Sequence, residues 1–190
     1  MSQLLCILAH PNFAASRANA ALSAHIRRLP GAQVTDLYAR YGGTQAIDVD
    51  AEAQALMAAD AIVLQFPLQW YSTPSLLKEW QDQVLTQMMY VAPQTQGCRL
   101  AGKPVMVVAT AGATFEDYTP GGRNGVSVSD LLLPLQAMAR RCGLRWLPPF
   151  VVYDTRNLGD EALAEAGESL LMHLAAHLAP QGEPAPACMT

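Results

Sequence analysis

Short runs of apolar residues alternate along this chain with longer stretches whose apolar positions recur at helical spacing. The runs of strand length are Gln3 to Ala9, Gln33 to Tyr38, Ala61 to Phe66, Pro104 to Ala109 and Trp146 to Tyr153. Each precedes an expected helix, over Ser16 to Leu29, Ala51 to Ala59, Pro74 to Gln87, Val128 to Arg141 and Asp160 to Leu178. The pattern therefore predicts five strands and five helices in strict alternation.

The strand-length runs do not alternate between apolar and polar residues, as strands of a sheet with one solvent-exposed face do. Ala61-Ile62-Val63-Leu64 and Val105-Met106-Val107-Val108 are apolar throughout, as a parallel sheet covered on both faces requires. Right-handed crossovers place helices on both faces of such a sheet. We therefore expect an α/β, flavodoxin-like, doubly wound fold with a five-stranded parallel sheet in the order 2-1-3-4-5. Pro148-Pro149 suits an edge strand, because proline donates no hydrogen bond to the ladder.

Composition and charge narrow the class of protein. A chain of 190 residues with 51% hydrophobic content fits one domain, expected over residues 1–179. Residues 180–190 are polar and proline-rich, so we expect a disordered tail. The net charge of −4 without a basic run offers nucleic acid no electrostatic footprint, and none is expected as a partner. His10-Pro11-Asn12 interrupts the first apolar run, so neither a signal peptide nor a membrane span is expected and the predicted location is cytoplasmic.

The cysteines and histidines indicate no metal or redox motif. Cys6, Cys98, Cys142 and Cys188 stand far apart, and none belongs to a C-x-x-C pair. Cys6 and Cys142 are expected to be small buried hydrophobes. The remaining candidates are His173 and His177, which lack a third ligand nearby, so no metal site is predicted and both are expected at the surface.

The most distinctive loop follows the third strand. It reads Pro67-Leu68-Gln69-Trp70-Tyr71 and continues into Ser72-Thr73-Pro74. We expect the next helix to start at once, with Thr73 as its N-cap and Pro74 at its first position. Such a loop presents backbone N–H groups and an aromatic face to a planar ligand. The alternative is that Trp70 and Tyr71 fill the space between strand and helix.

Two further loops end at the same edge of the predicted sheet. After the first strand, Ser16, Arg17, Ala18 and Asn19 gather at a helix N-terminus, either as a phosphate site or as an ordinary capped helix. After the fourth strand, the small residues of Thr110-Ala111-Gly112-Ala113 allow close approach to a flat ring. A flavin would satisfy all three loops, with its ring across Leu68 to Tyr71 and Thr110 to Ala113.

Several strings resemble the NAD(P)H quinone reductase family with a flavodoxin-like fold. They are Ala9-His10-Pro11, Pro67-Leu68-Gln69-Trp70-Tyr71-Ser72-Thr73-Pro74, Leu76-Leu77-Lys78-x-Trp80 and Cys142-Gly143-Leu144-x-Trp146-Leu147-Pro148-Pro149. The chain most resembles the bacterial branch that includes the ancillary subunits of glutathione-gated potassium-efflux systems, over Leu4 to about Leu178. The resemblance implies a homodimeric flavoprotein that takes hydride from NADPH or NADH and passes it to a quinone or similar acceptor in ping-pong order.

The resemblance also implies the cofactor and its contacts. FMN is favoured over FAD, and the contacts fall on His10, Ser16, Arg17, Ala18, Asn19, Pro67, Leu68, Gln69, Trp70, Tyr71, Thr110, Ala111, Gly112 and Ala113. The family usually shows Thr-Thr-Gly-Gly in the last loop. This chain has Ala111 and Ala113 instead, and their methyl groups are expected to narrow the approach to the ring.

The mammalian branch balances charge on the flavin with a Tyr and a downstream His. Tyr118 stands at the Tyr position, and Asn124, beside Arg123, stands at the His position. Because Asn does not titrate near neutral pH, we infer that backbone donors, Tyr118 or Arg123 balance the charge. Met88 to Gly102 is long for a connection, which indicates a lid or a dimer contact. Its Tyr90 either lines the acceptor pocket or is a surface residue.

Three functions remain open from the sequence. The first is a free-standing quinone reductase. The second is a regulatory ancillary subunit of a membrane potassium-efflux transporter, peripheral to the inner face of the membrane, with redox activity secondary. The third is a flavin-binding protein without turnover.

Overall fold

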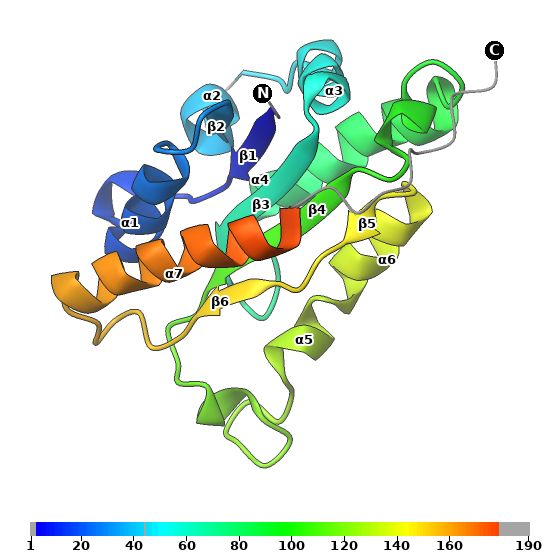
Figure 1. Ribbon diagram of the computed structural model, residues 1–190. Helices are drawn as coiled ribbons and strands as arrows, with labels where there is room; N and C mark the ends of the chain where they lie inside the picture. The colour runs from blue at the N-terminus through cyan, green and yellow to red at the C-terminus, as the bar shows by residue number, and fades with distance from the viewer. Residues whose placement is uncertain (1–2, 44, 179–190) are drawn as a thin grey trace.

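A parallel sheet forms the centre of the computed structural model, which describes residues 3–43 and 45–178 (Figure 1). The strands found in these residues are β1 (Leu4–Leu8), β2 (Ala32–Asp36), β3 (Ala61–Pro67), β4 (Pro104–Thr110), β5 (Arg145–Trp146) and β6 (Phe150–Val152). Their order is β2-β1-β3-β4-β5, and β6 also pairs with β4. The predicted order is confirmed. The predicted tail, residues 180–190, lies outside the described residues.

The fifth strand differs from the prediction, because it is two short strands and not one. β5 and β6 both pair with β4 in parallel, and Pro148-Pro149 lies between them. Neither proline has an N–H to give to β4, so the ladder breaks at this point. The edge position expected for the proline pair is confirmed, since β4 already pairs with β3 on its other side.

Helices cover both faces of the sheet, as Figure 1 shows. Their bounds are α1 (Arg17–Ile26), α2 (Leu37–Tyr41), α3 (Val49–Ala58), α4 (Ser75–Trp80), α5 (Val128–Leu131), α6 (Leu133–Arg141) and α7 (Asp160–Leu178). α1 and α7 pack on one face, where Leu22, Ile26, Leu170 and Leu174 join the core. α3, α4 and α6 lie over the other face.

The sequence pattern missed α2 and merged α5 with α6 into one helix, and both differences have local causes. Asp36 ends β2 and caps α2, because its carboxylate accepts hydrogen bonds from the N–H groups of Tyr38 and Ala39. The second predicted strand therefore stops at Asp36 and not at Tyr38. The predicted helix over Val128 to Arg141 is two helices, α5 and α6, with Pro134 in the first turn of α6.

The segment after α4 is helical for longer than expected. The helix continues as π-helical turns over Gln81–Leu85 and Gln87–Val91, and a 3₁₀ turn spans Gly97–Leu100. The connection predicted over Met88 to Gly102 is therefore shorter than expected, because the helix runs on to Val91, and a lid or dimer contact there stays a prediction.

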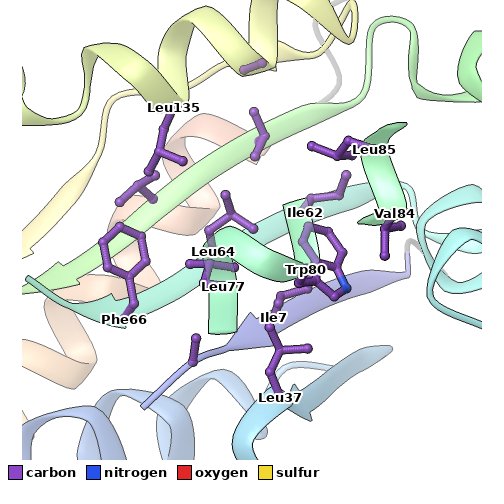
Figure 2. Close-up of a cluster of buried hydrophobic side chains, with 14 of the residues drawn as sticks. Ile7, Leu37, Ile62, Leu64, Phe66, Leu77, Trp80, Val84, Leu85 and Leu135 are labelled. Atoms are coloured by element: carbon purple, nitrogen blue, oxygen red, sulfur yellow. The ribbon is translucent and has the colours of Figure 1, made fainter. Parts of the chain in front are cut away.

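The larger core cluster lies between the sheet and the α3–α4–α6 layer. Figure 2 shows Ile7, Ile62, Leu64 and Phe66 of the strands facing Leu77, Trp80, Val84 and Leu135 of the helices. Within this layer the buried Glu52 carboxylate accepts hydrogen bonds from Trp80 Nε1 at 3.0 Å and Tyr41 Oη at 2.8 Å. Arg40 pairs with the same carboxylate at 2.7 Å. Glu52 therefore joins α2, α3 and α4.

Two of the cysteines lie in the core, as predicted. Burial raises the pKa of the Cys6 thiol to about 12 and also raises the pKa of Cys142. Both thiols therefore stay protonated at neutral pH and act as small hydrophobes. Within residues 3–43 and 45–178, no helix is long and apolar enough to cross a membrane.

Candidate functional site

The three loops singled out in the sequence meet at the carboxyl edge of the sheet. Leu68 N donates to Thr110 O at 2.8 Å, which joins the ends of β3 and β4. Asn19 Nδ2 donates to Thr110 Oγ1 at 2.9 Å, which brings the N-terminus of α1 to the same point. The three loops therefore meet at one edge of the sheet, as expected.

A tight turn carries the aromatic residues of the second loop. Gln69 and Ser72 exchange two backbone hydrogen bonds at 3.0 Å. Trp70 and Tyr71 form the turn, with positive φ angles of 46° and 64°. A left-handed conformation at two consecutive bulky residues is strained, and such strain concentrates at functional sites.

The aromatic side chains of this turn point outward. Trp70 is 94% exposed and Tyr71 is 46% exposed. The alternative that they fill the space between strand and helix is therefore wrong. An indole held in water by a strained turn contributes little to the core, so its surface is available to a ligand.

The predicted start of α4 is wrong by one residue. The helix begins at Ser75, with Pro74 at the N-cap position and no side-chain cap. Thr73 therefore does not cap the helix. Tyr38 Oη lies 3.4 Å from Leu76 N and accepts its hydrogen bond, so an aromatic hydroxyl from α2 replaces the missing cap.

A hollow of about 240 Å³ lies between the aromatic turn, the loop after β4 and residues 114–125. The residues that line it are Leu68, Trp70, Tyr71, Gly112, Ala113, Tyr118, Arg123, Asn124 and Arg156. The side chain of Ala111 is buried in the core, so only the Ala113 methyl narrows this hollow.

Unused backbone donors surround the hollow. In the part of the chain that the structure describes, no acceptor takes the main-chain N–H of Trp70, Tyr71, Gly112 or Ala113. Four N–H groups on two facing loops suit the oxygen and nitrogen atoms along one edge of a planar heterocycle. The hollow is built to receive hydrogen-bond acceptors.

Tyr118 and Asn124, both expected to be catalytic, line the hollow. Tyr118 is 8% exposed, and burial, together with the neighbouring Tyr71, raises the pKa of its hydroxyl against the opposing effect of Arg123. The hydroxyl therefore stays protonated at neutral pH and can donate a hydrogen bond. Asn124 Oδ1 accepts a hydrogen bond from Tyr71 Oη at 3.3 Å. Arg123, the third expected residue, lies 3.5 Å from Asp117.

The first loop presents a helix N-terminus and does not line the hollow. Ser16 Oγ accepts a hydrogen bond from Asn19 N at 3.3 Å, which confirms Ser16 as the cap of α1. Among the described residues, no acceptor takes the N–H groups of Arg17 and Ala18. These two donors and the helix dipole suit an anion.

The side chains predicted at this phosphate end have other partners. The Arg17 guanidinium contacts Asp160 at 2.6 Å and donates to Leu158 O at 3.0 Å, at the start of α7. Asn19 is only 2% exposed and donates to Thr110. His10 Nδ1 accepts a hydrogen bond from Asn12 N at 3.1 Å. Partial burial lowers the pKa of His10 although Asp36 opposes the shift, so the ring is neutral at neutral pH.

Arg156 is the residue of the hollow that the sequence reasoning missed. A Cβ atom placed on Gly112 would lie 3.1 Å from Arg156 Nε, so the guanidinium rests against the Gly112 backbone. The sequence feature that could have identified Arg156 is its position in the loop after the last strand, because every such loop reaches the carboxyl edge of a parallel sheet. A side chain at position 112 would therefore meet the Arg156 guanidinium.

The fold and this site define a class. The Flavodoxin_2 family model, described as a flavodoxin-like fold, matches residues 2–177, and the chain belongs to this family.

The relatives of this chain include proteins named as oxidoreductases and as ancillary proteins of a potassium-efflux system. An uncharacterized NAD(P)H oxidoreductase, YrkL, from Bacillus subtilis (strain 168) is 38% identical over 172 residues, 90% of this chain and 97% of the relative. The glutathione-regulated potassium-efflux system ancillary protein KefG from Cronobacter sakazakii (strain ATCC BAA-894) is 38% identical over 181 residues, 95% of this chain and 97% of the relative.

Solved structures agree on the fold. The general stress protein 14 from Treponema denticola, solved in complex with FMN, is 32% identical with a TM-score of 0.83, over 92% of this chain and 98% of that one. An NADPH-quinone reductase from P. pentosaceus is 28% identical with a TM-score of 0.78, over 92% and 97% of the two chains.

Proposed function

We propose that this chain is an FMN-dependent NAD(P)H:quinone oxidoreductase. The observation that carries the proposal is the hollow at the carboxyl edge, where four backbone N–H groups on two facing loops have no acceptor among the described residues. The names of relatives that span nearly all of this chain, and the FMN complex of a structural neighbour, support it.

The residues present fit this cofactor. The donors of Trp70, Tyr71, Gly112 and Ala113 would hold the ring, and the free N–H groups at the start of α1 would hold the phosphate. Bound FMN would supply two-electron chemistry between NAD(P)H and the acceptor. FMN is favoured over FAD because the complexed neighbour contains FMN.

The side chains of the hollow would position and shield the reacting groups. The exposed Trp70 indole offers a wall beside the ring, and the protonated Tyr118 hydroxyl offers a hydrogen bond to it. Asn124 holds Tyr71 by a hydrogen bond and cannot act as an acid or base. Rate enhancement at this site would therefore come from orientation and backbone donors.

The test is an anaerobic reduction. FMN-loaded protein is mixed with NADPH or NADH, and its visible absorption is followed before and after adding a quinone. The proposal expects the flavin bands to bleach with one of the nucleotides and to return with the quinone. Bands that stay unbleached with both nucleotides would overturn the assignment.

A homodimer is part of the proposal. A groove of about 330 Å³ between the helical layer after β3 and the α5–α6 pair opens beside the site, and Leu68 lines both the groove and the hollow. Tyr90, Val91 and Leu133 expose apolar surface on these elements, and a second copy would cover it. Light scattering should give twice the chain mass, and a monomer at assay concentration would contradict this.

The second candidate function is an ancillary subunit of a potassium-efflux transporter. A relative that is 38% identical over 95% of this chain carries that name, which specifically favours this candidate. It would place the protein at the inner face of the membrane through its partner. Co-purification with the cytosolic part of such a transporter from the same organism tests the association, and its failure would leave the free-standing reductase.

A further inference from the structure

Arg156, in the wall of the hollow, is a cation with no partner among the described residues. Among residues 3–43 and 45–178, no hydrogen bond or ion pair involves its guanidinium. The nearest carboxylate in sequence, Asp154, accepts a hydrogen bond from Asn157 Nδ2 at 2.7 Å instead. Arg156 Nε lies against Gly112, whose own N–H is unused. The exposed Arg156 side chain therefore places its donor fork next to free backbone donors.

The charge of the hollow contrasts with the charge of the molecule. Arg156 and Arg123 line it, and no carboxylate from the described part of the chain does. The whole chain carries a net charge of −4. Asp117 lies 3.5 Å from Arg123, and it also accepts hydrogen bonds from Thr114 N at 3.2 Å and Thr114 Oγ1 at 3.3 Å. Excess positive charge therefore remains at Arg156, and such a site favours an anion.

We infer that Arg156 stabilises the negative charge that FMN carries in its two-electron-reduced form. The inference rests on the proposed function. Transfer of a hydride from NAD(P)H leaves NAD(P)⁺ and adds two electrons and one proton to the flavin, so the reduced ring carries one more negative charge. Passing that hydride to a quinone, which takes one further proton from water to form the hydroquinone, restores the oxidised ring.

This role explains how the charge on the reduced flavin is balanced although position 124 has no titrating side chain. Tyr118 is held protonated and donates a neutral hydrogen bond, and Asn124 is neutral throughout. A guanidinium keeps its charge at every working pH. The loop after β6 thus supplies a permanent charge to the same wall of the hollow.

The experiment compares the reduction potential of bound FMN in three variants. R156Q removes the charge, R156K retains it, and R140Q removes a charge from an exposed position on α6 outside the hollow. For each, FMN affinity is measured in the oxidised and the reduced state, and the potential follows from a dye equilibrium. The pKa of the reduced flavin is read from its absorption spectrum.

R156Q should lower the preference for reduced over oxidised FMN by about tenfold, which corresponds to a potential about 30 mV more negative for a two-electron couple. The pKa of the reduced flavin should rise by about one unit in R156Q, in proportion to that loss. R156K should recover most of both changes, and R140Q should match the unaltered protein.

Equal potentials in R156Q and R140Q would overturn the inference. So would an R156Q variant that loses its preference between NADPH and NADH while its potential stays unchanged, because Arg156 would then recognise the nucleotide phosphate. If the unaltered protein binds no FMN, the proposed function has failed, and that outcome is distinct from an FMN-loaded R156Q protein with an unshifted potential.

Discussion

Trp70 and Tyr71 are two residues whose backbone conformation lowers the stability of the turn at the candidate site. Both adopt left-handed φ angles, which cost bulky residues energy, and the Trp70 side chain gains no burial in return. Asn-Gly is the sequence that a two-residue turn of this kind prefers. The aromatic pair therefore destabilises the turn but offers flat surfaces against which a planar ligand can pack.

Replacing the pair tests this reading. The double variant Trp70→Asn/Tyr71→Gly should raise the free energy of unfolding of the FMN-free protein by about 1 kcal/mol, because both residues then suit the turn. FMN affinity should fall at least about tenfold through loss of the aromatic wall. Urea denaturation and FMN titration measure the two effects. An FMN-free variant less stable than the unaltered protein would contradict the account.

The sequence identified most residues of the hollow but not their conformation. Leu68, Tyr118 and Asn124 were recognisable from motif positions. The exposure of Trp70 was not, because an aromatic residue beside a buried strand is equally consistent with core packing. Arg156 was missed because an isolated Arg in a loop has no spacing signature, and its place in the hollow shows only in the folded structure.

At the scale of the elements, the two helix starts near the site differ in how they are capped. Ser16 accepts a hydrogen bond from Asn19 N, whereas Thr73 lies one residue before the N-cap of α4 and caps nothing. Ser16→Ala should therefore lower the free energy of unfolding by about 1 kcal/mol. Thr73→Ala is the matched control and should stay within about 0.5 kcal/mol of the unaltered protein. Equal losses by urea denaturation would contradict these cap assignments.

The buried carboxylate that joins three helices gives a larger expected effect. Glu52 is 2% exposed and accepts hydrogen bonds from Arg40, Tyr41 and Trp80. Glu52→Ala leaves the Trp80 indole N–H and the Tyr41 hydroxyl without this acceptor, so it should cost about 3 kcal/mol of unfolding free energy. Gln54→Ala, at an exposed position of the same helix, should change it by less than about 0.5 kcal/mol. A loss below about 1 kcal/mol for Glu52→Ala would show that the network contributes little.

Element type was easier to predict than element bounds, for physical reasons. Apolar runs identified β1, β3 and β4 because a strand buried on both faces needs them. The fifth strand broke where two prolines remove ladder donors. The predicted helix over Pro74 to Gln87 runs on to Val91 as π-helical turns, and no periodicity signal fixes where such turns stop.

At the scale of the whole molecule, the fold explains why the site lies where it does. Parallel strands all end at one edge, so loops from residues 68–71, 110–113 and 154–157 meet although they lie far apart in the sequence. The hollow lies at the loops after β3, β4 and β6, and the free N–H groups at the start of α1 follow β1 at the same edge. Chain order alone therefore predicts which edge holds the candidate site, while the charge of the hollow required side-chain positions.

One titration tests the central claim that this hollow holds FMN. The fluorescence of FMN is followed as protein is added, for the unaltered chain and for Asn124→Trp, which fills the hollow. Gly121→Trp, in the same loop, points a side chain into open space and serves as the control. One FMN should bind per chain, with affinity at least about tenfold weaker in Asn124→Trp and unchanged in Gly121→Trp. Equal affinity in all three proteins would show that FMN binds elsewhere, and no binding to the unaltered chain would show that this chain is not a flavoprotein.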